Sequence, residues 1–275
     1  MPNPLVTVLI AARDSPTLPA VLGSLDCQSY ENFEVVVIDD GSIEPIKIAP
    51  SSTGDRVTLV RLENSVGRSE ARNLGLGKSK GKYVVIHDAD DLSSPERIEW
   101  SVGALERNSE LVAVSGQFFT FDKHGVYRGP RWPTDSESIR NGLSEGRMRL
   151  AHPAATILKS AIEDAGGYKP SLERAEDYDL FVRLSALGRM QASSEYLLAY
   201  SHPRIESASS FSSDYAWRQA AVRKQYSMSN RYRAAGYVRY PLYSAKLLAT
   251  RRPLQLQDTP LWWQRYCLEL GSPPW

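Results

Sequence analysis

Three aspartates lie within four positions, shortly after a run of apolar residues. The run is "YVVI", residues 83–86, and Asp88, Asp90 and Asp91 follow it after a single histidine. Carboxylates this close repel one another, so something positive must offset their charge. On a strand, Asp88 and Asp90 would project from one face about 7 Å apart and could share a cation. A hard divalent cation binds carboxylate together with phosphate oxygens, so the pair predicts Mg²⁺ or Mn²⁺ holding a phosphorylated substrate.

A solvated turn is the alternative interpretation of these acidic residues. For Asp91 we favour it, because Ser94 and Pro95 are typical of the start of a helix immediately afterwards. For Asp88 and Asp90, which follow the apolar strand, we favour the metal site.

A second acidic pair follows another apolar run. Asp39 and Asp40 come after "VVVI" and before Gly41 and Ser42. A carboxylate at the end of a strand can accept a hydrogen bond from a nucleobase, whereas the alternative is an Asx-turn. Ligands of open α/β sheets bind beyond the carboxyl ends of the strands, so two Asp-rich strand ends favour a binding site.

Two arginines four positions apart are candidates for contacts with phosphate. Arg68 and Arg72 would lie on one face of a helix, where a pair of guanidinium groups can clamp a pyrophosphate. A solvated helix face is the alternative for arginines at this spacing.

The elements that must position these side chains alternate along the first 110 residues. Short apolar runs begin near residues 5, 33, 57 and 82, and helix-like segments follow the first and third of them at residues 18–30 and 65–81. Near-continuous apolar strands that alternate with helices predict a mostly parallel sheet covered by helices, here a nucleotide-binding half. Further on, we expect two strands between residues 113 and 128, and two helices near residues 160–167 and 175–188.

The composition is that of an ordinary globular protein. Its 275 residues, 42% of them hydrophobic, can form one large or two small domains. The two cysteines, Cys27 and Cys267, lack metal-ligand spacing and the density of a disulfide framework, so we interpret them as packing residues in a reducing compartment. No run reaches the roughly 20 apolar residues of a membrane-spanning helix, and the start lacks the features of a signal peptide, so we expect a cytoplasmic protein.

The net charge of +1 conceals two regions of opposite sign. Residues 216–275 hold 10 Lys and Arg against 2 Asp and Glu, a balance of +8, while residues 1–215 hold 23 against 30, a balance of −7. Nothing in this basic, aromatic extension resembles a nucleic-acid reading motif, so we expect no nucleic-acid partner. The alternatives are a peripheral contact with anionic lipid at the inner face of the membrane, a homodimer contact, or helices packed over the rest of the chain.

Four blocks of sequence, taken together, resemble family 2 glycosyltransferases of the GT-A fold. They are "VTVLIAARD", "VLGSLDCQSYENFEVVVIDDGS", "GRSEARNLGLGKSKGKYVVIHDADD" and "AEDYDLFVRLSALG", in the order and spacing of the family. The resemblance implies an α/β, GT-A-type nucleotide-binding fold, with a mostly parallel central sheet flanked by helices and a C-terminal helical extension. Residues 1–110 would bind the nucleotide sugar, and residues 111–215 would bind the acceptor and supply the base in the same domain, ahead of the extension at 216–275.

The resemblance assigns roles to individual residues of the donor site. Asp40 matches the position that binds the base, usually uracil, and Ala11 and Arg13 lie where the first strand meets the nucleoside. Asp88 and Asp90 match the Asp-x-Asp metal motif of the family, with Asp90 as the direct ligand. Together with the two arginines, the expected nucleotide-binding residues are Ala11, Arg13, Asp40, Arg68, Arg72, Asp88 and Ala89.

Two further residues are assigned near the reacting groups. Asp177 of "EDYD" matches the catalytic base of the family, although a simple helix N-terminal acid is the alternative for Asp177 or Asp179. His202 falls near the end of the catalytic region of the family, where we expect either a metal ligand beside the diphosphate or, as for His152, a packed histidine.

The resemblance implies transfer of a sugar from a UDP-sugar or related nucleotide sugar to an acceptor hydroxyl. The acceptor would be a saccharide or a lipid-linked molecule, in cell-surface polysaccharide or glycolipid synthesis. Mn²⁺ or Mg²⁺ would stabilise the charge on the departing nucleoside diphosphate, while Asp177 takes the proton of the attacking hydroxyl. Direct displacement inverts the anomeric centre, so an α-linked donor would give a β-linkage.

Three other classes of protein fit the sequence less well. A phosphatase that forms an aspartyl phosphate has its Asp-x-Asp on an early strand, followed by Thr or Val, whereas this motif lies some 90 residues into the chain and ends with Leu92. A dehydrogenase is disfavoured because Gly75, Gly77 and Gly81 precede a strand instead of following one. A non-catalytic sugar-nucleotide-binding or scaffolding subunit is the remaining alternative, and the joint presence of the metal motif and the candidate base disfavours it.

Overall fold

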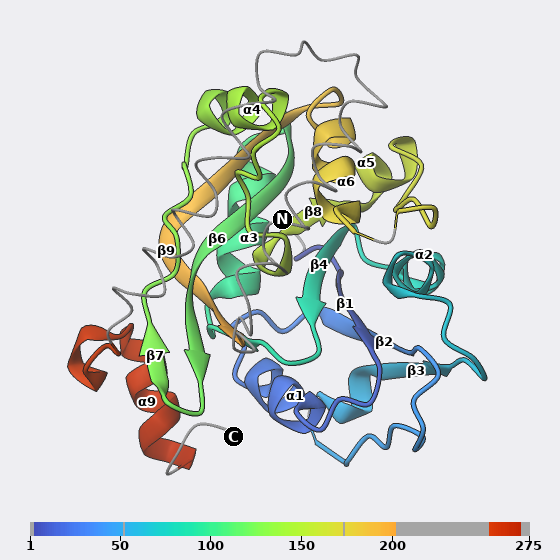
Figure 1. Ribbon diagram of the computed structural model, residues 1–275, viewed down its shortest axis with the longest axis vertical. Coiled ribbons are helices and arrows are strands. Elements are labelled where there is room, and N and C mark those ends of the chain that lie inside the picture. The colour runs from blue at the N-terminus through green and yellow to red at the C-terminus, as the bar shows by residue number, and fades with distance from the viewer. Residues whose placement is uncertain (1–2, 52, 173, 202–252, 271–275) are drawn as a thin grey trace.

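The computed structural model describes residues 3–51, 53–172, 174–201 and 253–270. Within these residues nine strands form one mixed sheet, in the order β3-β2-β1-β4-β8-β6-β9-β5, with β7 paired to β6 (Figure 1). The strands are β1 (Val6–Ala12), β2 (Phe33–Asp39), β3 (Val57–Arg61), β4 (Tyr83–Asp88), β5 (Leu92–Ser93), β6 (Leu111–Asp122), β7 (Gly125–Tyr127), β8 (Thr156–Leu158) and β9 (Arg189–Ser201).

The first half of the sheet is parallel. β1 pairs in parallel with both β2 and β4, and β2 pairs in parallel with β3. The register sets Ala11 of β1 between Ile38 of β2 and Asp88 of β4. Because parallel strands all end at the same edge of a sheet, the residues that follow β1, β2 and β4 gather at one edge.

The second half of the sheet mixes strand directions. β8 and β6 extend it through antiparallel pairs, and the long strand β9 lies parallel to β6. β5 pairs antiparallel with the end of β9, with Leu92 opposite Ala199 and Ser93 opposite Leu198. The residues that follow the acidic segment after β4 therefore pair directly with the other half of the sheet.

Helices cover both faces of the sheet, and each face has its own hydrophobic core. They are α1 (Leu18–Asp26), α2 (Arg68–Lys78), α3 (Arg97–Arg107), α4 (Ser136–Ser144), α5 (Lys159–Asp164), α6 (Glu176–Leu184) and α9 (Leu261–Leu270), with short 3₁₀ turns at Gly54–Arg56, His152–Ala154 and Leu256–Asp258. Side chains alternate along β1, so Leu9 packs in the core beneath α2, α4, α5 and α6, while Val8 and Ile10 pack with α1 and α3. The predicted helix-flanked, mostly parallel sheet is confirmed.

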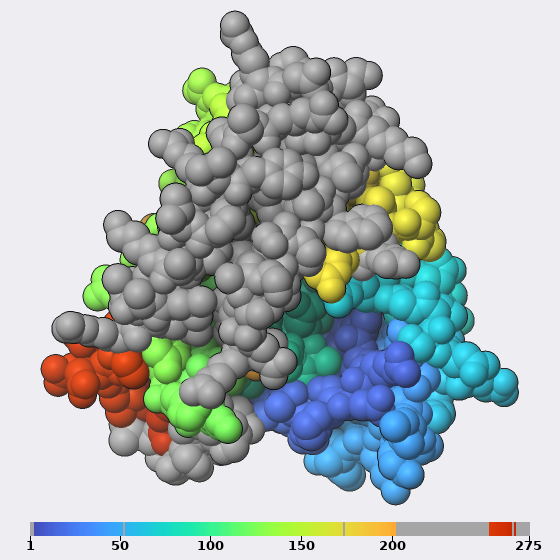
Figure 2. Space-filling view, in the orientation of Figure 1, coloured from blue at the N-terminus to red at the C-terminus, as the bar shows by residue number. Residues whose placement is uncertain are grey.

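The helix α9 packs on the edge formed by β6 and β7. Trp263 is fully buried, with its ring 5.0 Å from that of Phe119 and 5.4 Å from that of Phe121. The backbone N–H of Leu254 donates to the carbonyl of Val126 at 2.6 Å, which fixes the approach to α9. Figure 2 shows the red surface of this segment beside the green surface of β7. Of the predicted extension at 216–275, residues 216–252 and 271–275 lie outside the described residues.

Two expectations from the sequence differ from the structure. The helix after the acidic segment begins at Arg97, not at Ser94, because β5 first joins the sheet and the Ser94 N–H donates to the Leu197 carbonyl. The interpretation of Cys27 as a packing residue is wrong, since it is exposed, whereas Cys267 is half-buried against the α9 cluster. None of the helices in the described ranges has the length and apolar character needed to cross a bilayer.

Candidate functional site

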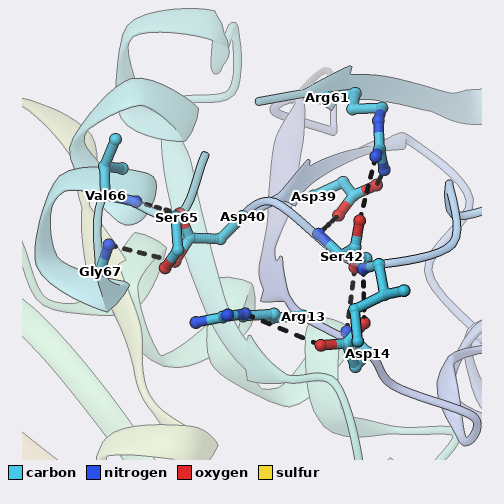
Figure 3. A network of polar contacts seen from close by, with 10 residues as sticks. Arg13, Asp14, Asp39, Asp40, Ser42, Arg61, Ser65, Val66 and Gly67 are labelled. Atoms are coloured by element: carbon cyan, nitrogen blue, oxygen red, sulfur yellow. Dashed lines mark hydrogen bonds and ion pairs between the residues drawn. The ribbon is translucent and has the colours of Figure 1, made fainter. Parts of the chain in front are cut away.

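Asp40 fixes the loop that leads into α2. Its carboxylate accepts hydrogen bonds from the Ser65 hydroxyl (2.8 Å) and from the backbone N–H groups of Val66 (2.7 Å) and Gly67 (3.1 Å) (Figure 3). A carboxylate has about four acceptor positions, so these three bonds leave one for a ligand. Gly41 has a φ of +71°, and a Cβ there would lie 2.6 Å from the Ser65 nitrogen, so only glycine permits this close approach of the two loops.

Asp39 has a structural role beside it. Its fully buried carboxylate accepts from the N–H groups of Ser42 (2.9 Å) and Ile46 (3.2 Å) and pairs with Arg61 at 2.7 Å. Burial alone would raise the pKa of Asp39, but the hydrogen bonds from Ser42 and Ile46 and the Arg61 guanidinium lower it below its usual range. Asp39 is closed off from solvent and neutralised by Arg61, so it shapes the loop, whereas Asp40 has no ion pair among the described residues and is the ligand candidate.

The rim of this edge carries Arg13, which the sequence assigned to the nucleoside. Its side chain is largely exposed and lies 3.7 Å from the Asp14 carboxylate, which also accepts from the Ile43 N–H at 2.7 Å (Figure 3). Ala11 lies on β1 directly between β2 and β4. Both residues therefore reach the edge where the resemblance places the nucleotide.

The acidic segment after β4 turns sharply. β4 ends at Asp88, and Ala89 and Asp90 form a turn, so the expectation that Asp88 and Asp90 project from one strand face is wrong. The Ala89 carbonyl accepts from the hydroxyls of Ser15 (2.8 Å) and Thr17 (2.9 Å), which hold the turn against the segment after β1. These bonds place Ala89 beside the end of β1.

Asp90 is exposed and has an unusual pKa. The protein atoms around its carboxyl desolvate it and the Asp88 charge repels it, and together they raise its pKa to about 6. Charge repulsion between Asp88 and Asp90 is what a shared cation would relieve.

The interpretation of Asp91 as part of a solvated turn is wrong. Its side chain is 0% exposed, and its Oδ1 accepts from the Ser201 N–H at 2.8 Å. Burial and the charges of Asp88 and Asp90 raise its pKa well above the usual value. The physical reason is the short strand β5, which binds β9 and draws Asp91 into the sheet before the chain can turn outward. Asp91 thus joins the acidic turn to the end of β9.

A buried polar layer that the sequence did not reveal supports this turn from behind. His87 bonds the Asp88 carbonyl through Nδ1 (2.7 Å) and the Ser93 hydroxyl through Nε2 (2.9 Å). Arg97, fully buried, donates to the Ile86 carbonyl (2.7 Å) and to the Ser93 hydroxyl (3.1 Å). Burial, and secondly the Arg97 charge, lower the pKa of His87 to about 3, so the ring is neutral. In the sequence, the only signal for this layer is that His87 and Arg97 lie close to the acidic motif on either side.

Arg72 joins two acidic segments that are far apart in the sequence. Its Nη2 donates to Asp88 Oδ1 and its Nη1 to Glu176 Oε1, both at 3.0 Å. The side chain is buried, and burial acting alone would lower its pKa, but Asp88, Tyr168 and Glu176 raise it above the ordinary value for arginine. The guanidinium is therefore a permanent cation between two carboxylates. Arg68, by contrast, is exposed and lies 3.7 Å from Glu176.

The first turn of α6 carries three acidic residues with different surroundings. Glu176 is buried against Arg72, while Asp179 is buried in ion pairs with Lys169 (3.1 Å) and Arg183 (2.6 Å). Asp177 is half-buried, and within the described residues its carboxylate accepts only from the adjacent Tyr178 N–H at 2.7 Å. Asp177 is thus the acid of this turn that is left for a substrate.

The two histidines of the sequence analysis have different outcomes. His152 is a packed histidine, as expected: its Nε2 bonds the Tyr168 hydroxyl at 2.8 Å, and burial lowers its pKa to about 3. His202 lies outside the described residues, so its assignment as a metal ligand stays a prediction.

The carboxylates after β4 could bind a divalent cation, although they do not supply a complete set of protein ligands. In the described part of the chain, no three His, Cys, Asp or Glu side chains are arranged to hold a metal ion. Mg²⁺-like ions need only one or two carboxylates, because water and substrate phosphates complete their coordination. The exposed carboxylate of Asp90, with its raised pKa, and the half-buried Asp88 supply such a pair.

The family model described as glycosyl transferase family 2 matches residues 7–166, more than half of the chain. The chain belongs to glycosyl transferase family 2. Among curated relatives, the amylovoran biosynthesis glycosyltransferase AmsE of Erwinia amylovora is 29% identical over 187 residues, which cover 66% of this chain and 70% of AmsE. The matched segment spans only 57% of one glycosyltransferase of Haemophilus influenzae, which is 31% identical over 172 residues.

Solved structures extend the comparison to the fold of this family 2 protein. The mannosyltransferase PcManGT of Pyrobaculum calidifontis, in complex with GDP-Man and Mn²⁺, superposes with a TM-score of 0.63 at 18% identity, covering 98% of this chain and 79% of its own. S. aureus TarS 1-349, in complex with UDP-GlcNAc, superposes with a TM-score of 0.59 at 17% identity, covering 94% and 77%. These likenesses confirm the GT-A-type fold. The division at residues 110 and 215 and the roles of individual residues stay predictions.

We predict that Asp40→Asn loosens the loop before α2. The substitution replaces a charged acceptor with a neutral amide, and a hydrogen bond to a charged group contributes roughly 1.5 kcal/mol or more. The amides of Val66 and Gly67 should therefore exchange with deuterium about tenfold faster or more. Asp14→Asn is the matched control on the same rim and should affect the Ile43 amide instead. Unchanged protection of Val66 and Gly67 in Asp40→Asn would contradict the role of Asp40.

Proposed function

We propose that this protein is an inverting glycosyltransferase that moves a sugar from a nucleotide sugar, a UDP-sugar by preference, to an acceptor hydroxyl. Membership of glycosyl transferase family 2 supports the reaction class. The structures of TarS with UDP-GlcNAc and PcManGT with GDP-Man and Mn²⁺ support a nucleotide-sugar donor and a divalent cation. The name of AmsE supports a place in polysaccharide biosynthesis. The acceptor would be a saccharide or a lipid-linked molecule.

One observation carries this proposal. Arg72 binds Asp88 and Glu176 at 3.0 Å each, so the acidic turn after β4 lies next to the first turn of α6. The candidate metal residues and the candidate base, 87 positions apart in the chain (177 − 90), are thereby gathered in one place. Metal-assisted displacement with a carboxylate base needs this combination.

The donor half of the proposed site lies along the edge of the parallel strands. Asp40 binds the base with its remaining acceptor position, and Ala11, Arg13 and Ala89 line the nucleoside. Asp88 and Asp90 would hold Mn²⁺ or Mg²⁺, and the bound cation would supply positive charge to offset the charge that develops on the leaving diphosphate. Arg68, exposed and partly held by Glu176, is free to add a positive charge beside that diphosphate.

The acceptor half centres on Asp177. A hydroxyl is a poor nucleophile, so its proton must be removed as it attacks the anomeric carbon, and the Asp177 carboxylate accepts it. Asp177 lies in the first turn of α6, beside the positive end of the helix dipole. Attack from the side opposite the leaving group forms the new glycosidic bond as the old one breaks, which inverts the anomeric centre.

We predict that Asp90→Ala weakens metal-dependent nucleotide binding. The substitution removes an exposed carboxylate that would share a cation with the diphosphate. Calorimetry with UDP should show that Mn²⁺ strengthens binding to the parent protein, and that this gain is lost in Asp90→Ala. Glu99→Ala, an exposed carboxylate on α3, is the control and should keep the gain. Equal UDP affinity with and without Mn²⁺ in the parent protein would remove the metal from the proposal.

We predict that Asp177→Asn separates binding from turnover. The amide keeps the size of the side chain but cannot accept the proton, so sugar transfer should fall by about 10²-fold or more while UDP affinity is retained. Asp179→Asn, on the same turn, should lower thermal stability by breaking the ion pairs with Lys169 and Arg183 but leave transfer nearly intact. Near-normal transfer by Asp177→Asn, with collapse in Asp179→Asn, would show that the base is the other carboxylate.

We also propose that the basic extension places the enzyme peripherally at the inner face of the membrane, where a lipid-linked acceptor would lie. The +8 balance of residues 216–275 supports this proposal. The two described tryptophans of the extension are held by the rest of the chain, because Trp263 is buried and the Trp262 Nε1–H donates to the Tyr196 carbonyl at 2.9 Å. The basic residues and the other aromatic residues of the extension would therefore supply the contact.

For the basic extension, we predict that the double substitution Arg231→Gln and Arg233→Gln reduces binding to anionic vesicles by roughly 30-fold, at about 1 kcal/mol per basic residue. Flotation with phosphatidylglycerol vesicles, and with neutral vesicles for reference, measures it. Arg107→Gln with Arg140→Gln, two exposed arginines outside the extension, is the matched control and should bind as the parent does. Equal flotation of both double variants would rule out the membrane contact, leaving a homodimer or intramolecular packing.

A further inference from the structure

Two adjacent residues of α2 bind the segment that leads into α6. Asn73 donates from Nδ2 to the Tyr168 carbonyl and accepts at Oδ1 from the Tyr168 N–H, both at 2.8 Å. Arg72 binds Glu176 through Nη1 and lies over the Tyr168 ring at 5.4 Å. In Figure 2 the cyan surface of α2 meets the yellow surface of the segment around α5 and α6. Through these two side chains, α2 connects the donor half of the site with the acceptor half.

The contact between α2 and this segment depends on a glycine. Gly167 has a φ of +69°, and a Cβ there would lie 2.8 Å from the Asn73 Oδ1. A side chain at this position would both strain the backbone and push away the amide that binds Tyr168. The glycine at position 167 thus allows the segment before α6 to lie close to α2.

The bridge from Asp88 through Arg72 to Glu176 is buried at Arg72 and Glu176 and half-buried at Asp88. Arg72 is 6% exposed and Glu176 is 4% exposed, so neither group can exchange its partner for water. Loss of one partner would leave an uncompensated buried charge, which is strongly destabilising. The planar guanidinium fork also fixes direction, since Nη1 faces Glu176 while Nη2 faces Asp88.

Asp177 has no comparable anchor of its own. Its carboxylate accepts only from the neighbouring N–H within the described residues, so the backbone of the first turn of α6 sets its position. That turn starts from Ala175 in the left-handed conformation, with a φ of +62°, which costs free energy and persists only where its surroundings hold it. Glu176, directly between Ala175 and Asp177, is the anchored residue.

We propose that Arg72 and Glu176 are positioning residues, which fix the base Asp177 relative to the metal-binding carboxylate Asp88. This proposal rests on the proposed function, and it gives Arg72 a role different from the diphosphate clamp that the sequence suggested. Both terminal nitrogens of Arg72 are bound to carboxylates of the protein, whereas the exposed Arg68 remains for a phosphate. A shift of about 1 Å in a reacting group can cost 10²-fold in rate, so the bridge would act on turnover more than on binding.

The variant that tests the bridge is Glu176→Gln, which keeps the size of the side chain and removes its charge. We expect transfer to fall by about tenfold or more, while the affinity for UDP with Mn²⁺ stays within about threefold of the parent value. Unchanged transfer would overturn the proposal. So would a loss of UDP affinity as large as the loss of transfer, because that would place Glu176 and Arg72 at the donor itself.

Asp179→Asn is the matched control, because Asp179 is also buried in ion pairs on the first turn of α6 but does not contact Arg72. It should lose thermal stability without the loss of transfer seen in Glu176→Gln. If both variants lose stability and transfer in proportion, the effect is general unfolding, and the positioning role is wrong.

A double-mutant cycle tests the bridge without any substrate. Arg72→Met, Glu176→Gln and the double variant are compared by their thermal unfolding midpoints. If the two residues act through each other, the double variant should unfold near the midpoint of the less stable single variant, because the second change removes an interaction already lost. Additive falls in the midpoint would overturn the bridge.

The two proposals fail in different ways. If the parent protein consumes no nucleotide sugar in a panel of donors with Mn²⁺, the proposed transferase activity is wrong, while the thermal cycle still decides whether the bridge exists. If the parent protein transfers sugar and Glu176→Gln does so equally well, the activity stands and the positioning role is wrong.

Discussion

The contact of one buried guanidinium with two carboxylates is the interaction on which the site depends. Without Arg72, the acidic turn after β4 and the acidic turn of α6 would repel each other across the edge of the sheet. With it, Asp88 and Glu176 each lie 3.0 Å from one permanent cation, while nearby Asp90 is exposed and Asp177 is half-buried. Burying these charges costs free energy, which is offset only when the guanidinium and both carboxylates are present. Removal of any one of the three groups should therefore destabilise the whole arrangement.

The sheet topology explains why these residues can meet. Parallel strands bring Asp40, Ala11 and Asp88 to one edge, and β5 then binds β9, so that the acidic turn is closed by the other half of the chain through Asp91 and Ser201. The proposed donor side is therefore shaped by strand pairing. The proposed acceptor side is joined to it by hydrogen bonds between side chains.

Much of this could be predicted from the sequence, because it depends on local pattern. The apolar runs gave the four parallel strands, and the Asp-rich strand ends indicated the edge that carries the site. The rest depends on contacts between residues that are distant in the sequence. Asp91 is buried because the two-residue strand β5 pairs with β9. Arg72 is buried where it pairs with Glu176, which lies 104 positions further along the chain. A helix-spaced arginine pair looks the same in sequence whether it binds phosphate or the protein's own carboxylates, as Arg68 and Arg72 show.

The central claim is that Asp88 and Asp90 hold a cation on the donor while Arg72 keeps the base turn of α6 in place. A crystal structure of the protein with UDP and Mn²⁺ tests it most directly, because manganese is located by its anomalous scattering. We expect a manganese peak between the diphosphate and the carboxylates of Asp88 and Asp90, with Arg72 still bound to Glu176. A manganese ion remote from both aspartates, or an Arg72 that leaves Glu176 to bind the diphosphate, would contradict it.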